Sequence, residues 1–483
     1  MGDEIELKLE LTPPAADLIE ASGLWPDGIG VLAQRSIYFD TPDLALAKAG
    51  LSLRVRHARG GWVQTVKADG ASTAGLFARA EWEFPVDGDT PVLDDRTPVA
   101  AALGEATDAI APIFDVLIER RRSIVEQDGA VIEVALDRGE AVAGERITPI
   151  CELELELKQG DPAALFALAR RIDAVAPVRL EVLSKAERGY RLSAEAPAMA
   201  KAGPVVLPRA ATAAQAFGRI VQASIRQFRL NEALLQAGRN PAALHQARVA
   251  LRRLRSAFAT FKPIVAGAAQ AHLATELRWL ACELGNARNL DVLLGRVGPG
   301  GLHDRLAAAR DAAYARVAEV LGAPRVRTLM LDLAAWTFAG DWTRLPTLAP
   351  DRDEPVREAA GRALDRFHRK VIKGGRHLET IDDESRHQLR KDAKKLRYAS
   401  DFFASVFGRK RERRRHRKFV AALEALQDQL GALNDLATAP QLLATLGIAP
   451  DATPLAEGGH RAKLLKQAAR AHADLHDRKR YWR

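Results

Sequence analysis

Cysteine is scarce in this sequence, which has only Cys151 and Cys282 among its 483 residues. Two cysteines so far apart exclude a disulfide framework and a cysteine-based zinc site, and a reduced cytoplasmic protein is the simplest interpretation. The chain also lacks an uninterrupted apolar run near the ~20 residues that a membrane-spanning helix needs. Charged residues begin at Asp3, so we expect no secretory signal at the N-terminus.

Basic residues are few in the first part of the chain, and acidic residues are few in the second. Residues 1–200 hold 21 Lys and Arg against 34 Asp and Glu, a net charge of −13. The remainder holds 50 against 28, a net charge of +22. Because the chain is also too long for one hydrophobic core, this asymmetry predicts separate units with different partners. The basic unit is expected to attract polyanions, whether nucleic acid, an anionic membrane or polyphosphate.

Polar and apolar residues alternate strictly in two predicted strands, residues 4–11 (EIELKLEL) and 151–158 (CELELELK). Alternate side chains of a strand point to opposite faces. The charged face of the first strand carries Glu4, Glu6, Lys8 and Glu10. The charged face of the second carries Glu152, Glu154 and Glu156. Ordinary half-buried strands would give this spacing, but two such strands that face each other would close one acidic cluster.

The spacing Glu4-x-Glu6-x-Lys8 resembles the signature of the CYTH superfamily, also called the triphosphate tunnel metalloenzymes. Residues 38–41 (YFDT), which precede Pro42, and residues 184–190 (SKAERGY) resemble two further motifs of this family. The resemblance implies a closed antiparallel β-barrel whose polar interior binds a triphosphate and a divalent metal ion.

About eight strands, each with one polar face, are predicted in an N-terminal α+β unit. The further strands lie at residues 35–40, 51–57, 62–67, 79–84, 117–126, 130–137 and 178–183. Buried charges are costly unless they are paired, hydrated or bound to a ligand. A water-filled tunnel lined by these faces avoids that cost. The alternative is a solvent-exposed sheet face, on which the many charges of both signs would have no common role.

A triphosphate carries several negative charges along a line, so it requires several cations along a cavity. The candidates that the alternation and the resemblance supply are Lys8, Arg54, Arg56, Lys67, Arg120, Arg122 and Lys185. Arginine matches phosphate oxygens in bidentate fashion, and lysine acts as a point charge. Mg²⁺ or Mn²⁺ takes oxygen ligands. The resemblance assigns the metal to Glu4, Glu6, Glu152 and Glu154, and we expect Glu4, Glu6, Lys8 and Lys67 to be the catalytic residues.

Three assignments stay open at this level. Glu156 competes with Glu152 for a place in the late pair of metal ligands, and we prefer Glu152 with Glu154. Within residues 120–122 (RRR) the alternation favours the outer two. Glu133 and Asp137 are either partners of the metal ligands or structural groups. Any single arginine would more often be a surface residue, so the prediction depends on the joint pattern.

Proline and small residues dominate residues 193–212, which we interpret as a linker between a domain at 1–192 and a domain at 213–483. From about residue 213 the apolar spacing changes to the 3.6-residue period of a helix. The second domain is therefore predicted to be all-α.

Two predicted helices carry the same stripe of cations at intervals of three, four and three. The first stripe is His245, Arg248, Arg252 and Arg255, and the second is His387, Arg390, Lys394 and Arg397. A later element recurs as well, with LGNARNL at 284–290 and LGALNDL at 430–436. An internal repeat of roughly 140 residues predicts two related four-helix bundles.

This region resembles the CHAD domain, a helical module that is named for its histidines and is often fused to CYTH. The resemblance implies polyphosphate binding through the basic helix faces, which here are the two stripes. Neither stripe has a second histidine at i+4, so we expect no metal there. The run at 409–418 (RKRERRRHRK) could bind nucleic acid, extend the polyphosphate face or be a solvated helix. Without an aromatic stacking platform, nucleic acid is the least favoured partner.

The combined hypothesis is an inorganic triphosphatase that uses Mg²⁺ or Mn²⁺ to hydrolyse inorganic triphosphate, followed by a domain that binds long-chain polyphosphate. The alternatives are a thiamine or nucleoside triphosphatase, an adenylate cyclase of the same superfamily, or a non-catalytic polyphosphate-binding scaffold. No membrane partner is expected. The preferred metal, the oligomeric state and any communication between the domains stay open.

Overall fold

The structure is a computed structural model that describes residues 4–23, 30–58, 60–68, 71–73, 76–195, 197–445 and 458–483. The chain forms two compact units. The first comprises Met1–Ala200, Arg229–Ala243 and Leu321–Gly340, and the second comprises Lys201–Phe228, Leu244–Val320 and Asp341–Arg483. The expected domain boundaries at residues 192 and 213 stay predictions.

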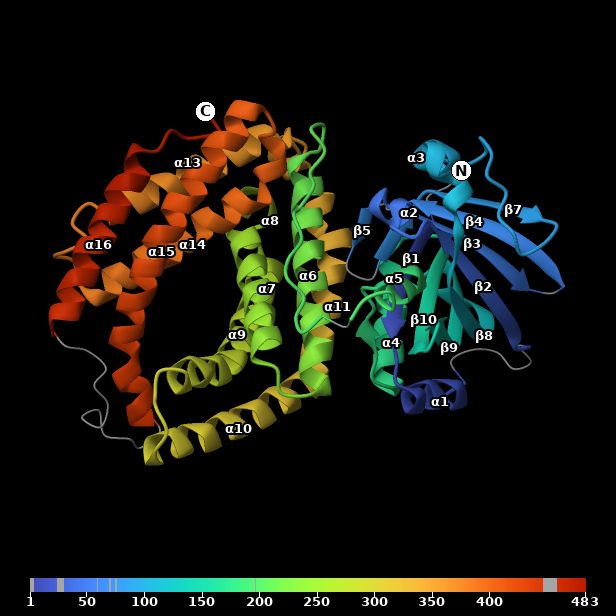
Figure 1. Ribbon diagram of the computed structural model, residues 1–483, viewed down its shortest axis with the longest axis horizontal. Coiled ribbons are helices and arrows are strands. Elements are labelled where there is room, and N and C mark those ends of the chain that lie inside the picture. The colour runs from blue at the N-terminus through green and yellow to red at the C-terminus, as the bar shows by residue number, and fades with distance from the viewer. Residues whose placement is uncertain are drawn as a thin grey trace. The chain divides into compact units, whose positions relative to one another are not determined.

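An antiparallel sheet of eleven strands, counted within the described residues, dominates the first unit (Figure 1). Its strands are β1 (Glu4–Glu10), β2 (Leu32–Asp40), β3 (Leu51–Ala58), β4 (Gly61–Ala68), β5 (Ala71–Thr73), β6 (Leu76–Arg79), β7 (Glu81–Val86), β8 (Ala111–Gln127), β9 (Ala130–Ala143), β10 (Arg146–Gln159) and β11 (Arg179–Leu180). The strand order is β5-β6-β1-β10-β9-β8-β2-β3-β4-β7, with β11 beside β1. The first strand of the chain therefore lies in the interior of the sheet, next to a strand that follows much later.

Among the described residues before 193, five short α-helices accompany this sheet. They are α1 (Pro13–Ala21), α2 (Ala45–Lys48), α3 (Val99–Leu103), α4 (Ala163–Val175) and α5 (Lys185–Arg191). A capping box begins α5, because the side chain of Ser184 accepts from the backbone N–H of Glu187 and the carboxylate of Glu187 accepts from the backbone N–H of Ser184. This cap fixes the backbone of Lys185, the first residue of the helix.

Alternation along the strands separates an apolar face from a charged face, and both faces of β1 are buried. Leu7 and Leu9 are fully buried on the apolar face. Glu6 and Lys8, on the charged face, are only 8% and 5% exposed. The interpretation of β1 as an ordinary half-buried strand with a solvated face is therefore wrong, and its charges require partners.

The expected number of about eight strands is too low. Two short strands were missed, β5 and β6, because residues 71–79 (ASTAGLFAR) are small or apolar and show no regular alternation. The strand expected at 79–84 is divided, since Ala80 lies outside both β6 and β7. The antiparallel character of the sheet is confirmed.

The helical part of the chain contains α6 (Ala213–Ala237), α7 (Pro241–Thr260), α8 (Lys262–Val265), α9 (Ala268–Leu294), α10 (Gly301–Gly322), α11 (Pro324–Ala339), α12 (Ala349–Arg352), α13 (Val356–Gly374), α14 (Asp383–Phe402), α15 (Lys410–Thr445) and α16 (Gly458–Asp477). The two cation stripes lie on α7 and α14, and the two copies of the later repeat element lie on α9 and α15. The internal repeat is thus a repeat of helix order. None of the described helices has the length and apolar character that a membrane crossing demands.

Candidate functional site

A cavity of about 320 Å³ lies within the first unit and is lined from eight strands and α5. Its acidic lining residues are Glu6, Glu81, Glu83, Glu133, Glu154 and Glu156. Its basic lining residues are Lys8, Arg54, Arg56, Lys67, Arg120, Arg122, Lys158 and Lys185. Because strands as distant in sheet order as β1 and β7 contribute to one lining, the sheet curves around the cavity. All seven expected phosphate-binding cations line this space.

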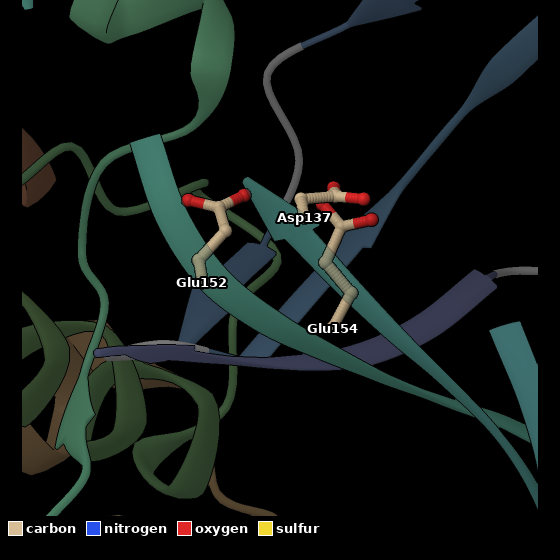
Figure 2. A group of neighbouring side chains, drawn as sticks. All are labelled: Asp137, Glu152 and Glu154. Atoms are coloured by element: carbon tan, nitrogen blue, oxygen red, sulfur yellow. The ribbon is translucent and has the colours of Figure 1, made fainter. Parts of the chain in front are cut away.

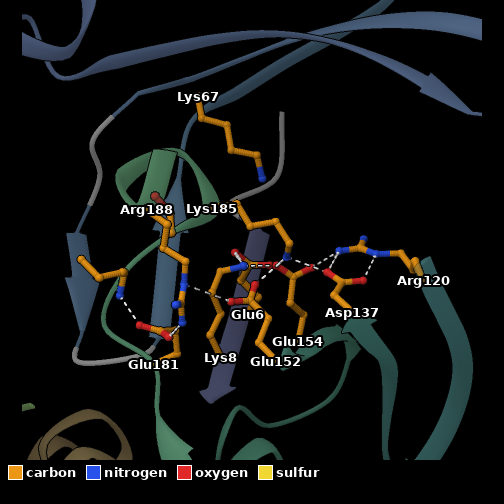
Figure 3. Close-up of polar contacts among 12 residues, drawn as sticks. Glu6, Lys8, Lys67, Arg120, Asp137, Glu152, Glu154, Glu181, Lys185 and Arg188 are labelled. Carbon is orange, nitrogen blue, oxygen red and sulfur yellow. Dashed lines mark hydrogen bonds and ion pairs between the residues drawn. The ribbon is translucent and has the colours of Figure 1, made fainter. Parts of the chain in front are cut away.

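Glu154 on β10 is the centre of a buried ion network (Figure 3). It forms ion pairs with Lys8, with Arg120 at 2.5 Å and with Lys185 at 2.9 Å. Arg120 also contacts Asp137 in bidentate fashion, with Nε at 2.6 Å and Nη2 at 2.5 Å. Asp137 is fully buried, so these partners are the means by which its charge is tolerated.

Carboxylates from β9 and β10 form a compact acidic triad of Asp137, Glu152 and Glu154 (Figure 2). One oxygen atom of each lies within 4.8 Å of the others. Glu152 is fully buried, and its Oε2 accepts no hydrogen bond from the described residues. Three carboxylates with an oxygen to spare match the ligand chemistry of Mg²⁺ or Mn²⁺. The acidic triad therefore fits a divalent metal ion.

The network shifts the pKa values of its members in the direction that keeps them charged. Burial alone would raise the pKa of Glu154, but Lys185 and Lys8 outweigh it and hold the pKa well below the usual range. Burial alone would lower the pKa of Lys185, yet Asp137 and Glu152 raise it well above the usual range. Lys8 follows the same logic, since Glu154 and Glu6 raise its pKa against the effect of burial.

The opposite wall of the cavity, from β3, β4 and β7, carries the remaining expected cations. Lys67 lies 3.1 Å from Glu81, and Arg56 lies 3.3 Å from Glu83. The Nε of Arg54 is buried without a hydrogen-bond partner in the described part of the chain. Burial opposes a raised pKa for Arg54, but Tyr38 and Glu81 raise it. On this wall, therefore, the Nε–H of Arg54 has no hydrogen-bond acceptor among the described residues.

The two alternating strands, β1 and β10, are hydrogen-bonded neighbours in the sheet rather than strands that face each other. Glu6 pairs with Glu156, and Lys8 pairs with Glu154. The late carboxylates divide between two environments, because Glu154 and Glu156 line the cavity whereas Glu152 lies behind them in the acidic triad. Glu4 pairs through its backbone with Arg79, and the side chain of Glu4 lies outside the described residues.

Sequence reasoning did not anticipate several members of the site. Asp137 was left between a partner and a structural role, and the structure brings it together with Glu152 and Glu154. The cavity lining also includes Glu81 and Glu83, whose alternation on β7 could have shown their common face. Tyr38 lines the cavity too, although it was noted only as part of a motif.

A second group of cations gathers in the other unit, where α7 and α14 bring the two stripes together. Arg252, Arg390 and Lys394 form no ion pair with any described residue, and the Nε atoms of Arg252 and Arg390 are buried without partners. Burial, Arg390 and Arg252 lower the pKa of Lys394 to about 7. Burial has the largest effect on this pKa, and the neighbouring arginines add to it while Asp435 opposes it, which indicates a local excess of positive charge.

Other stripe members have different surroundings. Burial, Arg288 and Arg252 lower the pKa of His245 to about 4, so this imidazole is neutral near pH 7. Burial and Arg252 lower the pKa of Arg248 to about 10, and Arg248 donates to the backbone oxygen of Ala281 at 2.8 Å. Arg288 belongs to the repeated LGNARNL element and was missed as a member of this group.

Both ends of the second stripe are occupied by local partners, whereas the end of the first stripe meets another base. His387 Nδ1 lies 2.6 Å from the side-chain oxygen of Asn434. Arg397 forms ion pairs with Glu424 at 3.3 Å and Asp401 at 3.7 Å. Burial and Arg278 lower the pKa of Arg255, which indicates a further basic neighbour there. Sequence spacing placed these residues on a face, but it could not show which of them meet acids or amides.

The first part of the chain is a sheet curved around paired acids and bases, and the second part consists of helices with a repeated basic stripe. These are the features expected of a CYTH unit followed by a CHAD unit. Comparison with protein families agrees: residues 2–190 match the CYTH domain, and residues 219–444 match the CHAD domain. The chain therefore contains a CYTH domain followed by a CHAD domain.

Individual relatives are similar to different parts of the chain. An inorganic triphosphatase from Haemophilus influenzae is 31% identical over 212 residues, which cover 40% of this chain and 56% of that protein. The crystal structure of a CHAD domain from the plant Ricinus communis is 30% identical, with a TM-score of 0.48, and covers 59% of this chain and 98% of its own. A Hippeastrum protein described as revealing a dominant triphosphatase activity is 17% identical, with a TM-score of 0.29, and covers 39% of this chain and 95% of its own.

Proposed function

We propose that the CYTH domain, residues 1–192, hydrolyses inorganic triphosphate to diphosphate and phosphate with the help of Mg²⁺ or Mn²⁺. The single observation that carries this proposal is the cavity, which is lined by eight basic side chains and a separate set of carboxylates. The similarity to an inorganic triphosphatase supports the same reaction.

The basic side chains would hold the phosphates from both walls of the cavity. Lys67 and Arg54 face the substrate from β4 and β3, and Lys8 faces it from β1. We assign the remaining phosphate contacts to Arg56, Arg120, Arg122 and Lys185. Fixed cations around the transferring phosphoryl group offset the charge that develops on the leaving diphosphate.

The carboxylates would hold the metal at the β1 and β10 side of the cavity. We assign this role to Glu4, Glu6, Glu152 and Glu154, and we add Asp137 because it belongs to the acidic triad. A divalent cation held there would supply positive charge to the phosphates and a water of lowered pKa. Because the pKa of Glu154 lies well below the usual range, this ligand is already ionised at neutral pH.

The size and lining of the cavity favour a small substrate that consists of phosphate alone. Tyr38 is the one aromatic side chain among the described lining residues, and its ring stacks on Phe114, so the cavity offers little aromatic surface to a base or to thiamine. A thiamine or nucleoside triphosphatase and an adenylate cyclase are therefore the second choices. A non-catalytic scaffold is disfavoured because acids and bases are both in place.

We further propose that the CHAD domain, residues 213–483, binds long-chain polyphosphate at the group formed by Arg248, Arg252, Arg288, Arg390 and Lys394. An excess of positive charge, which Asp435 offsets only in part, supports this assignment, since a polyanion would relieve the mutual repulsion. The patch of Arg411, Arg414, Arg415 and Lys418 beside Arg478 and Lys479 is a competing surface for the same ligand.

Phosphate release from tripolyphosphate, ATP and thiamine triphosphate, each with Mg²⁺ or Mn²⁺, tests the catalytic proposal. We expect tripolyphosphate to be the best substrate and Arg120→Ala to lose most of the activity. Arg121→Ala is the matched control, because Arg121 is exposed and pairs with Glu20 at 3.2 Å. Equal rates for all three substrates, or equal losses in both variants, would contradict the assignment.

A further inference from the structure

We infer that Lys185 occupies the metal position of the acidic triad and leaves it when a divalent cation binds, which delivers its ammonium group to the substrate cavity. The inference rests on the proposed function and deepens it, because it sets an order of binding: metal first, then triphosphate. It concerns a side chain that lies in contact with both the acidic triad and the cavity.

The ammonium of Lys185 sits among all three carboxylates of the triad. Its Nζ lies 2.6 Å from Asp137, 2.5 Å from Glu152 and 2.9 Å from Glu154. A lysine ammonium has three donors. With one carboxylate for each donor, Lys185 has no N–H left for a phosphate while it stays in this position (Figure 3).

A metal ion and this ammonium would compete for the same oxygens. The ligand atoms of the triad lie within 4.8 Å of one another, so one small cation can meet all three. The side chain of Lys185 is 7% exposed, and that of Glu152 is fully buried. A divalent cation brings twice the charge of the ammonium to the same carboxylates, which favours the exchange.

Only the side chain of Lys185 has to move. The capping box of Ser184 and Glu187 holds the first turn of α5, with the backbone N–H of Ser184 donating to Glu187 at 2.9 Å. A lysine stem is flexible and its ammonium is a compact point charge. Since Lys185 already lines the cavity, leaving the triad takes its charge toward a bound phosphate.

Direct binding of Mn²⁺ in the absence of any phosphate tests the competition. By isothermal titration calorimetry we expect Lys185→Met to bind Mn²⁺ at least about tenfold more tightly than the wild type, because the competing cation is gone. Lys67→Met is the matched control, since Lys67 lines the same cavity but pairs with Glu81. Its affinity for Mn²⁺ should equal that of the wild type within about twofold. Equal or weaker binding by Lys185→Met would overturn the inference.

Chemical labelling of the wild type tests the movement without any variant. Acetylation of Lys185, followed by mass spectrometry, should be slow in metal-free protein, faster with Mn²⁺ and slow again when tripolyphosphate is added. Lys48, whose side chain is 66% exposed, is the reference and should react equally in all three states. Labelling of Lys185 that does not change with Mn²⁺ would overturn the inference.

The two proposals fail in different ways. If Mn²⁺ exposes Lys185 but the wild type releases no phosphate from tripolyphosphate, the proposed function is wrong and the exchange stands. If the wild type hydrolyses tripolyphosphate while Lys185→Met and the wild type bind Mn²⁺ alike, the exchange is wrong and the function stands.

Discussion

Replacing Asp137 by asparagine tests whether the ion network or the surrounding packing stabilises the sheet around the cavity. The substitution keeps the size of the side chain and removes its charge. Asp137 is fully buried and contacts Arg120 through two hydrogen bonds and Lys185 at 2.6 Å. Removing one partner of a buried ion pair costs about 3–5 kcal/mol, because the other charge is left without compensation.

The matched control is Asp115→Asn on the outer face of β8. Asp115 lies 2.9 Å from Arg35, and the two side chains are 31% and 52% exposed. A solvent-exposed pair of this kind contributes ~1 kcal/mol or less. The same chemical change should therefore have a much smaller effect at this position.

Hydrogen–deuterium exchange of β9 amides, in metal-free buffer, measures the local cost. A loss of 3–5 kcal/mol corresponds to exchange that is faster by roughly two to four orders of magnitude. Asp115→Asn should accelerate exchange by less than about tenfold. If both variants exchange alike, the network around Asp137 contributes little to stability and packing alone holds this part of the sheet.

Three further predictions concern metal, pH and polyphosphate. Glu6→Gln should reduce triphosphatase turnover by orders of magnitude, since an amide is a poor ligand for a hard cation. Glu119 is an exposed residue of β8, and Glu119→Gln should leave turnover unchanged. Similar rates for the two variants would contradict the metal assignment. The pKa of Asp137 and that of Glu154 lie below the ordinary 3.8 and 4.5, so their stabilisation is present above those values and lost as the pH falls through the lower folded values. Thermal unfolding against pH should show that loss only below about pH 4.5, and a loss that begins near pH 7 would refute it. Replacing Arg252, Arg390 and Lys394 by alanine should weaken binding of long-chain polyphosphate much more than replacing Arg411, Arg414 and Lys418, and should reduce its salt dependence. Binding is measured by fluorescence titration. A larger loss in the variant that lacks Arg411, Arg414 and Lys418 would place the polyphosphate site on the patch formed by these residues of α15.

Alternation along single strands was sufficient to predict which face of β1, β3 and β4 lines the cavity. Lys8, Arg54 and Lys67 all line the cavity as their spacing suggested. Spacing within one strand says nothing of what lies across the cavity, however. Asp137 could not be distinguished from a structural group, because its role depends on Arg120 and on a lysine from a separate helix.

The register of the late carboxylates was beyond sequence reasoning for a similar reason. Glu152, Glu154 and Glu156 share one face of β10, and only their depth in the sheet separates them. The short strands β5 and β6 were missed because their pairing with β1 depends on tertiary position rather than on local pattern. In the helical part, Arg397 forms ion pairs with Asp401 of its own helix and with Glu424 of α15. The spacing of the repeated stripe could not predict either partner.

The position of β1 in the sheet has a consequence for how the protein is made. Residues 6 and 156 pair across β1 and β10, so β1 finds this partner only after β10 has been synthesised. Although β6 can pair with β1 earlier, the side of β1 that meets β10 stays open until then, which favours slow closure of the sheet. The helices that follow depend on local contacts and can form as they emerge. The cavity that carries the proposed chemistry is therefore completed only after β10 and α5 have been synthesised, well after β1.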